Sequence, residues 1–93
     1  MSITINKIRS VGYTTLVDYN DGEGQLVITG SYGQHGGLVH TVLDAEVDGG
    51  LRTLAAVKDL PYDEACQRIR TVLLRKLKDE DQVSRVMGFI QGR

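Results

Sequence analysis

The chain has 93 residues, of which 41% are hydrophobic and 25% charged, so it fits one globular domain of ordinary composition. Its 11 basic and 12 acidic residues give a formal net charge of −1, which argues against a global field attracting nucleic acid or anionic lipid. No apolar run approaches the ~20 residues of a membrane-spanning helix, and residues 2–10 are alternating and charged, unlike a secretory signal. We therefore expect a small cytoplasmic protein that is better suited to surface binding than to holding a deep active-site cavity.

The first part of the chain alternates apolar and polar residues, as half-buried β-strands do. This alternation predicts one strand near residues 2–9 and another over 13–19, where β-branched and aromatic side chains are dense. Residues 20–24, Asn-Asp-Gly-Glu-Gly, favour a tight turn because Asn, Asp and Gly tolerate positive φ at little steric cost. Residues 25–29 supply the return strand, so 13–29 is predicted to form a hairpin.

A glycine-rich stretch and a longer strand come next. Four glycines among residues 30–37 predict a loop, but it lacks the Gly-Lys-Ser/Thr ending of a phosphate-binding loop and the spacing of a dinucleotide-binding one. Residues 38–47 are the longest strand candidate, and a turn at 48–50 returns the chain into a last strand over 51–57. The face of 38–47 that we expect to pack on the core carries Val39, Thr41, Leu43, Ala45 and Val47. The face that we expect to stay outside carries Leu38, His40, Val42, Asp44 and Glu46.

At Pro61 the apolar period changes from two to about 3.6, which predicts an amphipathic helix over residues 62–78. Its apolar stripe consists of Ala65, Cys66, Ile69, Val72, Leu73 and Leu77. The acidic residues 79–81 interrupt this stripe, which resumes at Val83, Val86, Met87 and Ile90. We prefer a second helix over about 80–91 that starts with an Asp cap, the alternative being one long helix with a polar patch.

These patterns predict a two-layer α+β fold. An antiparallel sheet of four to five strands over about 2–57 is followed by one or two C-terminal helices packed on one of its faces. The sheet face and the helix stripe must cover each other, since each is apolar on one side only. No repeat, low-complexity tract or linker divides the sequence, so residues 1–93 are predicted to be a single domain.

The glycine-rich loop and its neighbours are the first candidate binding site. Tyr32, Gln34 and His35 would offer a partner one aromatic anchor and two adaptable polar groups. His35 and His40 are the two histidines of the chain, and side chains five residues apart on an extended strand point to opposite faces. His40 and Asp44 share a face but lie about 13 Å apart along a strand, too far to hold one metal ion together. We therefore expect no metal site, no catalytic histidine and no cofactor.

The polar face of the first predicted helix is the second candidate site. Arg68, Arg75 and Lys78 lie along one side of this helix, with Arg70 and Lys76 at the edges of its apolar stripe. A glutamate stands four residues before Arg68, in the favourable orientation for an ion pair, and an acidic run follows the helix. This balance favours a solvated charged face over a nucleic-acid site, and an acidic protein docking on the arginines is a third interpretation.

The single cysteine, Cys66, lies on the apolar stripe, so we expect a small buried hydrophobic residue rather than a nucleophile. The sequence as a whole predicts a non-catalytic protein-binding module, acting as a regulator, inhibitor or assembly factor. It would bind another protein through the glycine loop and the open sheet face, or through the arginine-bearing helix face. The alternatives are a nucleic-acid-binding protein using the basic helix face and, less favoured, an enzyme or ligand-binding subunit with a site at an oligomer interface. A homodimer formed through the open sheet face or an edge strand is a further expectation.

Overall fold

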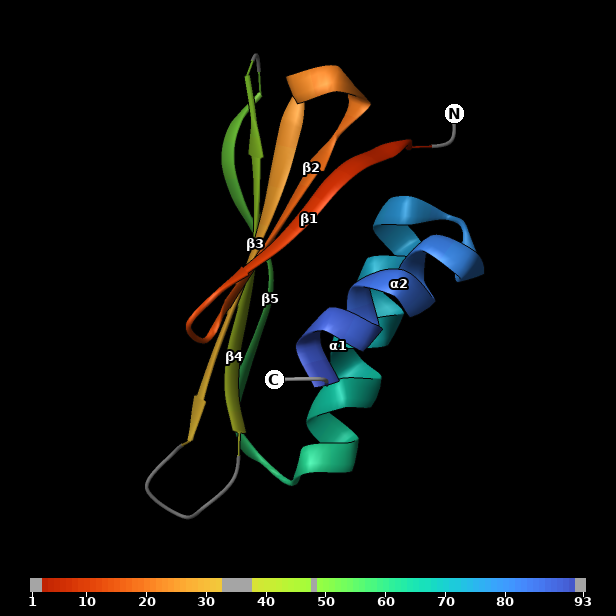
Figure 1. Cartoon of the computed structure of the whole chain (residues 1–93). Coiled ribbons are helices and arrows are strands. Elements are labelled where there is room, and N and C mark those ends of the chain that lie inside the picture. The colour runs from red at the N-terminus through yellow and green to blue at the C-terminus, as the bar shows by residue number, and fades with distance from the viewer. Residues whose placement is uncertain (1–2, 33–37, 48, 92–93) are drawn as a thin grey trace.

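The computed structural model describes residues 3–32, 38–47 and 49–91 of the chain. Five strands form one antiparallel sheet and two helices follow them, which confirms the predicted two-layer α+β fold (Figure 1). The strands are β1 (Ile5–Val11), β2 (Thr14–Tyr19), β3 (Gly24–Tyr32), β4 (Leu38–Glu46) and β5 (Gly50–Leu60). The helices are α1 (Tyr62–Leu77) and α2 (Glu80–Gln91). The largest departures from the predicted bounds are that β1 starts later, at Ile5, that β3 continues to Tyr32 into the predicted loop, and that β5 continues to Leu60.

The sheet is a meander in which each strand pairs with the next one along the chain, in the order β1-β2-β3-β4-β5. β2 and β3 form the predicted hairpin, in register from Thr14 opposite Thr29 to Tyr19 opposite Gly24. Its turn begins with the predicted Asn-Asp-Gly stretch, where Asn20 and Asp21 have φ angles of 50° and 54°. Asn and Asp enter this left-handed region more readily than other residues with a side chain, which is why the sequence locates the turn.

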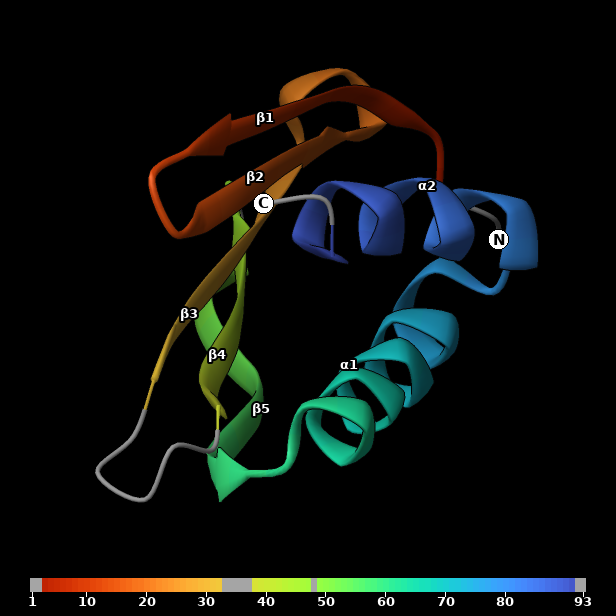
Figure 2. The same ribbon diagram turned by 60° about the horizontal axis from the view of Figure 1, so that its bottom comes forward.

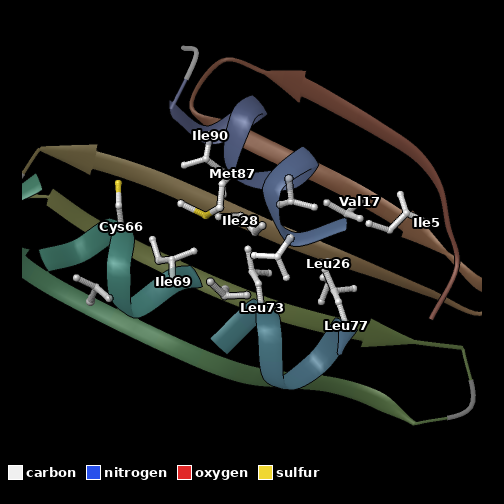
Figure 3. Packing of buried hydrophobic residues seen from close by; sticks show 14 of the residues in the cluster. Ile5, Val17, Leu26, Ile28, Cys66, Ile69, Leu73, Leu77, Met87 and Ile90 are labelled. Carbon is white, nitrogen blue, oxygen red and sulfur yellow. The ribbon is translucent and has the colours of Figure 1, made fainter. Parts of the chain in front are cut away.

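The two helices cover one face of the sheet (Figure 2). α1 packs against β4 and β5, and α2 packs against β1 and β2. The apolar side chains of the helices interlock with those of the sheet between the two layers (Figure 3). The buried set is Ile5, Val17, Tyr19, Leu26, Ile28, Val42, Val57, Ala65, Cys66, Ile69, Leu73, Leu77, Val83, Val86, Met87 and Ile90. The predicted helix stripe is therefore confirmed, except that Val72 is half-buried.

The prediction of which face of β4 packs on the core is wrong. Val42 and Asp44 are buried on the helix-covered side, whereas Val47 is 75% exposed in the turn after the strand. The pairing register decides this, because Val42 lies opposite the buried Ile28 and directly paired residues share a side of the sheet. Both faces of β4 carry apolar residues, so the strand alone does not decide which face is buried. The face that turns inward is the one whose acidic residue has partners on that side of the sheet. The residues of the predicted core face that lie on the open side are half-buried: Thr41, Leu43 and Ala45.

The helical segment divides at Lys78, as the preferred two-helix interpretation predicts. Lys78 ends α1 in a left-handed conformation, with φ 54° and ψ 34°. Asp79 Oδ1 then accepts hydrogen bonds from the backbone N–H groups of Asp81 at 2.9 Å and Gln82 at 3.3 Å. This is the predicted Asp cap, and the break allows α2 to run in a different direction from α1 (Figure 2).

Candidate binding groove

An open groove with a volume of about 510 Å³ runs between β5 and α1, which stand beside each other in Figure 2. Its strand wall consists of Ala55, Ala56 and Val57. Its helix wall consists of Glu64, Gln67, Arg68, Thr71, Val72 and Arg75. A second hollow of about 400 Å³ shares Val72 and Arg75 with the first and reaches Arg52, Thr53, Leu54 and Lys76. We call the two hollows together the β5–α1 groove.

The groove exists because the side chains of β5 are too small to fill the space beside α1. The helix packs on the sheet through Ile69, Leu73 and Leu77, which are all completely buried. Its flank toward β5 carries polar residues at three- and four-residue spacing, and these stay outside the core. On the helix-covered side the strand offers Ala55, whose single methyl group leaves the space open, and Ala56 also lines the groove.

β5 turns its edge toward the groove. Residues 55–57 line it together, although successive side chains of a strand point to opposite faces of a sheet. A run of consecutive residues borders one groove when the backbone edge of the strand faces it. β5 is the last strand of the sheet and pairs with β4 alone among the strands that the structure describes. Its outer backbone N–H and C=O groups are therefore presented along the groove.

Two irregularities limit the regular part of this edge. Relative to β4, extra residues interrupt β5 between Thr53 and Ala55 and again between Val57 and Leu60. The first interruption turns both Leu54 and Ala55 toward the core cluster, which both of them contact. Ala55–Val57 is the regular stretch between the two interruptions, so an added strand would find three consecutive residues to pair with.

Arginine side chains border the groove, and the two ion pairs that they form are long, with the guanidinium groups more than half exposed. Arg68 lies 3.8 Å from Glu64, with the two side chains 63% and 52% exposed. Arg52 lies 3.5 Å from the buried Asp44 and is itself 66% exposed. Arg75 lines both hollows and forms no ion pair with any residue whose side chain the structure describes. Exposed ion pairs contribute about 0–1 kcal/mol, so the Arg68 guanidinium is available to a ligand, and Arg75 and the mostly exposed Arg52 lie beside it.

A buried ionic cluster lies next to the groove and joins α1 to the sheet. Tyr19 Oη donates a hydrogen bond to Asp44 Oδ1 at 2.5 Å, and Lys76 Nζ lies 2.7 Å from Asp44 Oδ2 and 3.0 Å from Glu46 Oε1. The Lys76 ammonium also lies 5.1 Å from the centre of the Tyr19 ring. That ring covers Gly24, where a Cβ atom would overlap it. The cluster therefore fixes one end of the helix wall against β2 and β4.

Burial and hydrogen bonding both act on the pKa values of this cluster. Burial alone would raise the pKa of Asp44, but hydrogen bonds from Lys76 and Tyr19 outweigh it and hold that pKa below its ordinary value. Burial alone would lower the pKa of Lys76, but hydrogen bonds to Asp44 and Glu46 raise it above its ordinary value. Burial, followed by the bond to Asp44, raises the pKa of Tyr19 to about 12. Near neutral pH the cluster thus pairs a carboxylate with an ammonium, and a neutral phenol donates to the carboxylate.

The structure places two of the predicted partner-binding residues, Arg68 and Arg75, on the helix wall of the groove. Lys78 is the left-handed cap of α1 and belongs to neither hollow. Cys66 is buried, as the sequence predicts. The sequence interpretation did not include Arg52, because its approach to the helix arginines depends on how β5 and α1 pack rather than on any local pattern.

The glycine-loop candidates are not tested by the structure. Tyr32 ends β3 and His40 lies in β4, but the side chains of both are outside the described residues, as are Gln34 and His35 altogether. Within residues 3–32, 38–47 and 49–91, no group of three His, Cys, Asp or Glu side chains is placed to hold a metal ion. A role for these four residues in binding stays a prediction.

The sheet face away from the helices is open. Leu16, Val27 and Leu43 lie side by side across β2, β3 and β4, and all three are half-buried. The sequence interpretation assigned Val42 to this face, but Val42 belongs to the covered one. Tyr13 is 68% exposed, immediately before β2. The open face therefore carries a narrow apolar row whose residues differ from those expected.

Comparison of the chain with protein-family models, with curated proteins and with solved structures found no match. Among the described residues, no helix is both long and apolar enough to cross a membrane. The groove, its arginines and the edge of β5 are therefore the observations from which a function can be argued.

Proposed function

We propose that this protein is a non-catalytic protein-binding module whose β5–α1 groove receives an extended segment of another protein. The observation that supports the proposal is the outer edge of β5, which no described strand pairs with and which faces a groove walled on its other side by a helix. An extended segment in this position would pair its backbone with Ala55–Val57 and place alternate side chains against α1. The small side chains of Ala55 and Ala56 let such a segment approach closely.

The opposite edge of the sheet provides a comparison within the same molecule. The Gln82 side chain of α2 donates a hydrogen bond to the Ile3 carbonyl at 2.6 Å and accepts one from the Ile5 N–H at 2.9 Å. Thr4, between them, bonds to Asn20 on the inner side, so Gln82 occupies the outward-facing backbone at the start of β1. Among the described residues, no side chain bonds in this way to the edge of β5.

Nucleic-acid binding is the second candidate function, because Arg52, Arg68 and Arg75 border one groove. Three observations favour a protein segment over nucleic acid. The whole chain carries a net charge of −1, Glu64 belongs to the same wall as the arginines, and none of the described residues that line the groove is an aromatic able to stack on a base. Nucleic acid therefore serves as a competing outcome in the tests below.

Selection from a phage-displayed library of random peptides tests the proposal. Peptides that bind the protein are expected to lose at least about tenfold in affinity for Thr71→Trp, whose bulky side chain would fill the groove from an exposed helix position. Ser84→Trp places the same side chain on an exposed position of α2 outside the groove and is expected to leave the affinity unchanged. Fluorescence anisotropy with labelled peptides measures both.

Two outcomes would overturn the proposal. The first is a selection that enriches no peptide, and the second is a set of peptides that binds Thr71→Trp as tightly as the parent protein. Thermal unfolding of both tryptophan variants serves as the control, since each substitution lies on an exposed helix face and should leave the fold intact.

A further inference from the structure

We infer that the segment received by the β5–α1 groove is an acidic strand whose carboxylates lie on the face turned toward α1. The inference rests on the proposed function and adds the chemistry of the partner. It follows from three features of the groove, which are its uncompensated charge, the spacing of its arginines and the short length of the strand edge.

The charge of the groove is the first feature. Lys76, at the inner end, is already held by Asp44 and Glu46, and it is mostly buried. Arg75, which lines both hollows, has no acidic partner among the described residues. Arg68 has one, but at 3.8 Å and on the surface, where a ligand carboxylate can replace it. A carboxylate near Arg75 therefore gains a guanidinium partner without breaking an existing ion pair.

The position of the one acidic residue in the helix wall sharpens this assignment. Glu64 lies in the first turn of α1, whereas Arg75 lies in its last turn, beside the hollow that reaches Arg52. Carboxylates of a ligand would meet a like charge at the Glu64 end and two arginines at the other end. The acidic part of the segment is therefore assigned to the part of the groove that runs from Arg68 to the Arg52 and Arg75 end, away from Glu64.

The spacing of the helix arginines is the second feature. Arg68 and Arg75 are seven residues apart, which corresponds to about 10.5 Å along a helix. Residues of a strand that share a face recur about every 7 Å, so carboxylates two or four residues apart lie within reach of both flexible arginine side chains. Carboxylates one or three residues apart point to opposite faces, and one of each pair then faces away from α1.

The short strand edge is the third feature. An added strand pairs with the three regular residues Ala55–Val57, and the interruptions of β5 limit further backbone pairing on either side. Backbone hydrogen bonds are independent of the sequence of the incoming chain, so a short edge gives little affinity by itself. Selectivity must then come from side chains that meet α1, and the side chains best placed to contribute are Arg68 and Arg75.

Two synthetic peptides of identical composition test the inference. In the first, glutamates alternate with valine and threonine, so that all carboxylates share one face. In the second, the glutamates stand in adjacent pairs, so that the carboxylates divide between both faces. We expect the alternating peptide to bind at least about tenfold more tightly in fluorescence anisotropy, with an affinity that falls as sodium chloride is raised. Amide shifts of Ala55–Val57 in a 15N-labelled sample should report where it binds.

Matched variants assign the effect to the groove. Arg75→Gln is expected to weaken the alternating peptide by about tenfold while leaving the urea midpoint of unfolding unchanged, since it removes no ion pair with a described side chain. Arg85→Gln makes the same exchange on an exposed position of α2 outside the groove and should leave peptide affinity unchanged. Equal binding of the two peptides, or equal loss in the two variants, would overturn the inference.

The remaining outcomes separate this inference from the proposed function. A peptide with glutamine in place of every glutamate that binds as tightly as the acidic one, and is blocked by Thr71→Trp, overturns the acidic partner and leaves the groove as a protein-binding site. Tighter binding of a single-stranded oligothymidine, lost in Arg75→Gln, overturns both in favour of nucleic acid. Failure of all these probes, together with a failed library selection, rejects the groove as a binding site.

Discussion

The two outer strands of the sheet are in different situations, although a helix lies near each. At β1, α2 supplies the Gln82 amide, which hydrogen-bonds to the outward-facing backbone of Ile3 and Ile5. At β5, α1 leaves a groove and borders it with arginines. Gln82 satisfies the first outward-facing backbone groups on the β1 side, whereas no described side chain does so for the Ala55–Val57 edge, which can therefore accept a partner chain. The comparison separates a structural edge from the proposed binding edge, and substitutions can test each side of it.

Lys76→Met is expected to have the largest effect, because it removes the closest cation from the buried Asp44 and loosens α1 at the binding edge. Breaking a buried ion pair by removing one partner costs about 3 kcal/mol or more in unfolding free energy. Urea denaturation followed by circular dichroism measures the loss. A protein unchanged in stability would show that the cluster does not fix the helix wall.

Two controls define this effect. Lys78→Met removes an exposed lysine near the same helix end and should change the unfolding free energy by less than about 0.5 kcal/mol. The double variant Lys76→Met with Asp44→Asn should lose less than the sum of the two single losses, because the residues are direct partners.

Gln82→Ala is expected to have an intermediate effect, since it removes both hydrogen bonds from the structural edge. The expected loss is about 1–2 kcal/mol of unfolding free energy, reduced slightly by the better helix propensity of alanine. The Ile5 amide proton should also exchange faster with deuterated solvent. Gln67→Ala, a matched change on the groove side, should alter neither quantity, and equal effects of the two variants would contradict the contrast between the edges.

The smallest expected effect is a loss of unfolding free energy at alkaline pH, which tests the buried cluster. The folded-state pKa of Tyr19 is about 12, against about 10 for an unperturbed tyrosine, so its contribution to stability is complete below pH ~10 and is lost as the pH rises toward 12. Lys76, whose pKa is also raised, acts in the same direction. Asp44, whose pKa is lowered, loses its contribution in acid below about pH 4.

Tyr19→Phe should lessen the loss of unfolding free energy between about pH 7 and pH 10.5 by roughly 1 kcal/mol, as read from urea denaturation. An alkaline loss equal to that of the parent chain would show that Tyr19 does not titrate with the cluster.

Local patterns predict the elements of this fold well, because their causes are local. The change from period two to about 3.6 at Pro61 places the first helix, and the acidic residues 79–81 place the break before the second. The Asn-Asp-Gly turn locates the second hairpin for the same reason, since its residues tolerate the required φ. Each of these features depends on neighbours within a few positions.

The inward face of β4 has a cause that lies far along the chain. Whether Val42 or Leu43 turns inward depends on the register with β3, and both alternatives look reasonable within the strand. Asp44 reads as a surface acid until Lys76, thirty-two residues later, is placed beside it by the packing of α1. The groove also depends on packing between distant parts of the chain. The arginine-bearing helix face can be predicted from the sequence, but the strand edge opposite it cannot.

Gly24 has a consequence for recognising relatives of this chain. The Tyr19 ring lies over it on the paired strand, so any side chain at position 24 must displace an aromatic group that is hydrogen-bonded to Asp44 and covered by Lys76. We expect these four positions to be inherited together. A descendant that replaces the tyrosine becomes free to accept a larger residue at position 24, but it still needs an acid at position 44 as long as Lys76 is present. The coupled set can therefore identify diverged sequences after overall similarity has been lost.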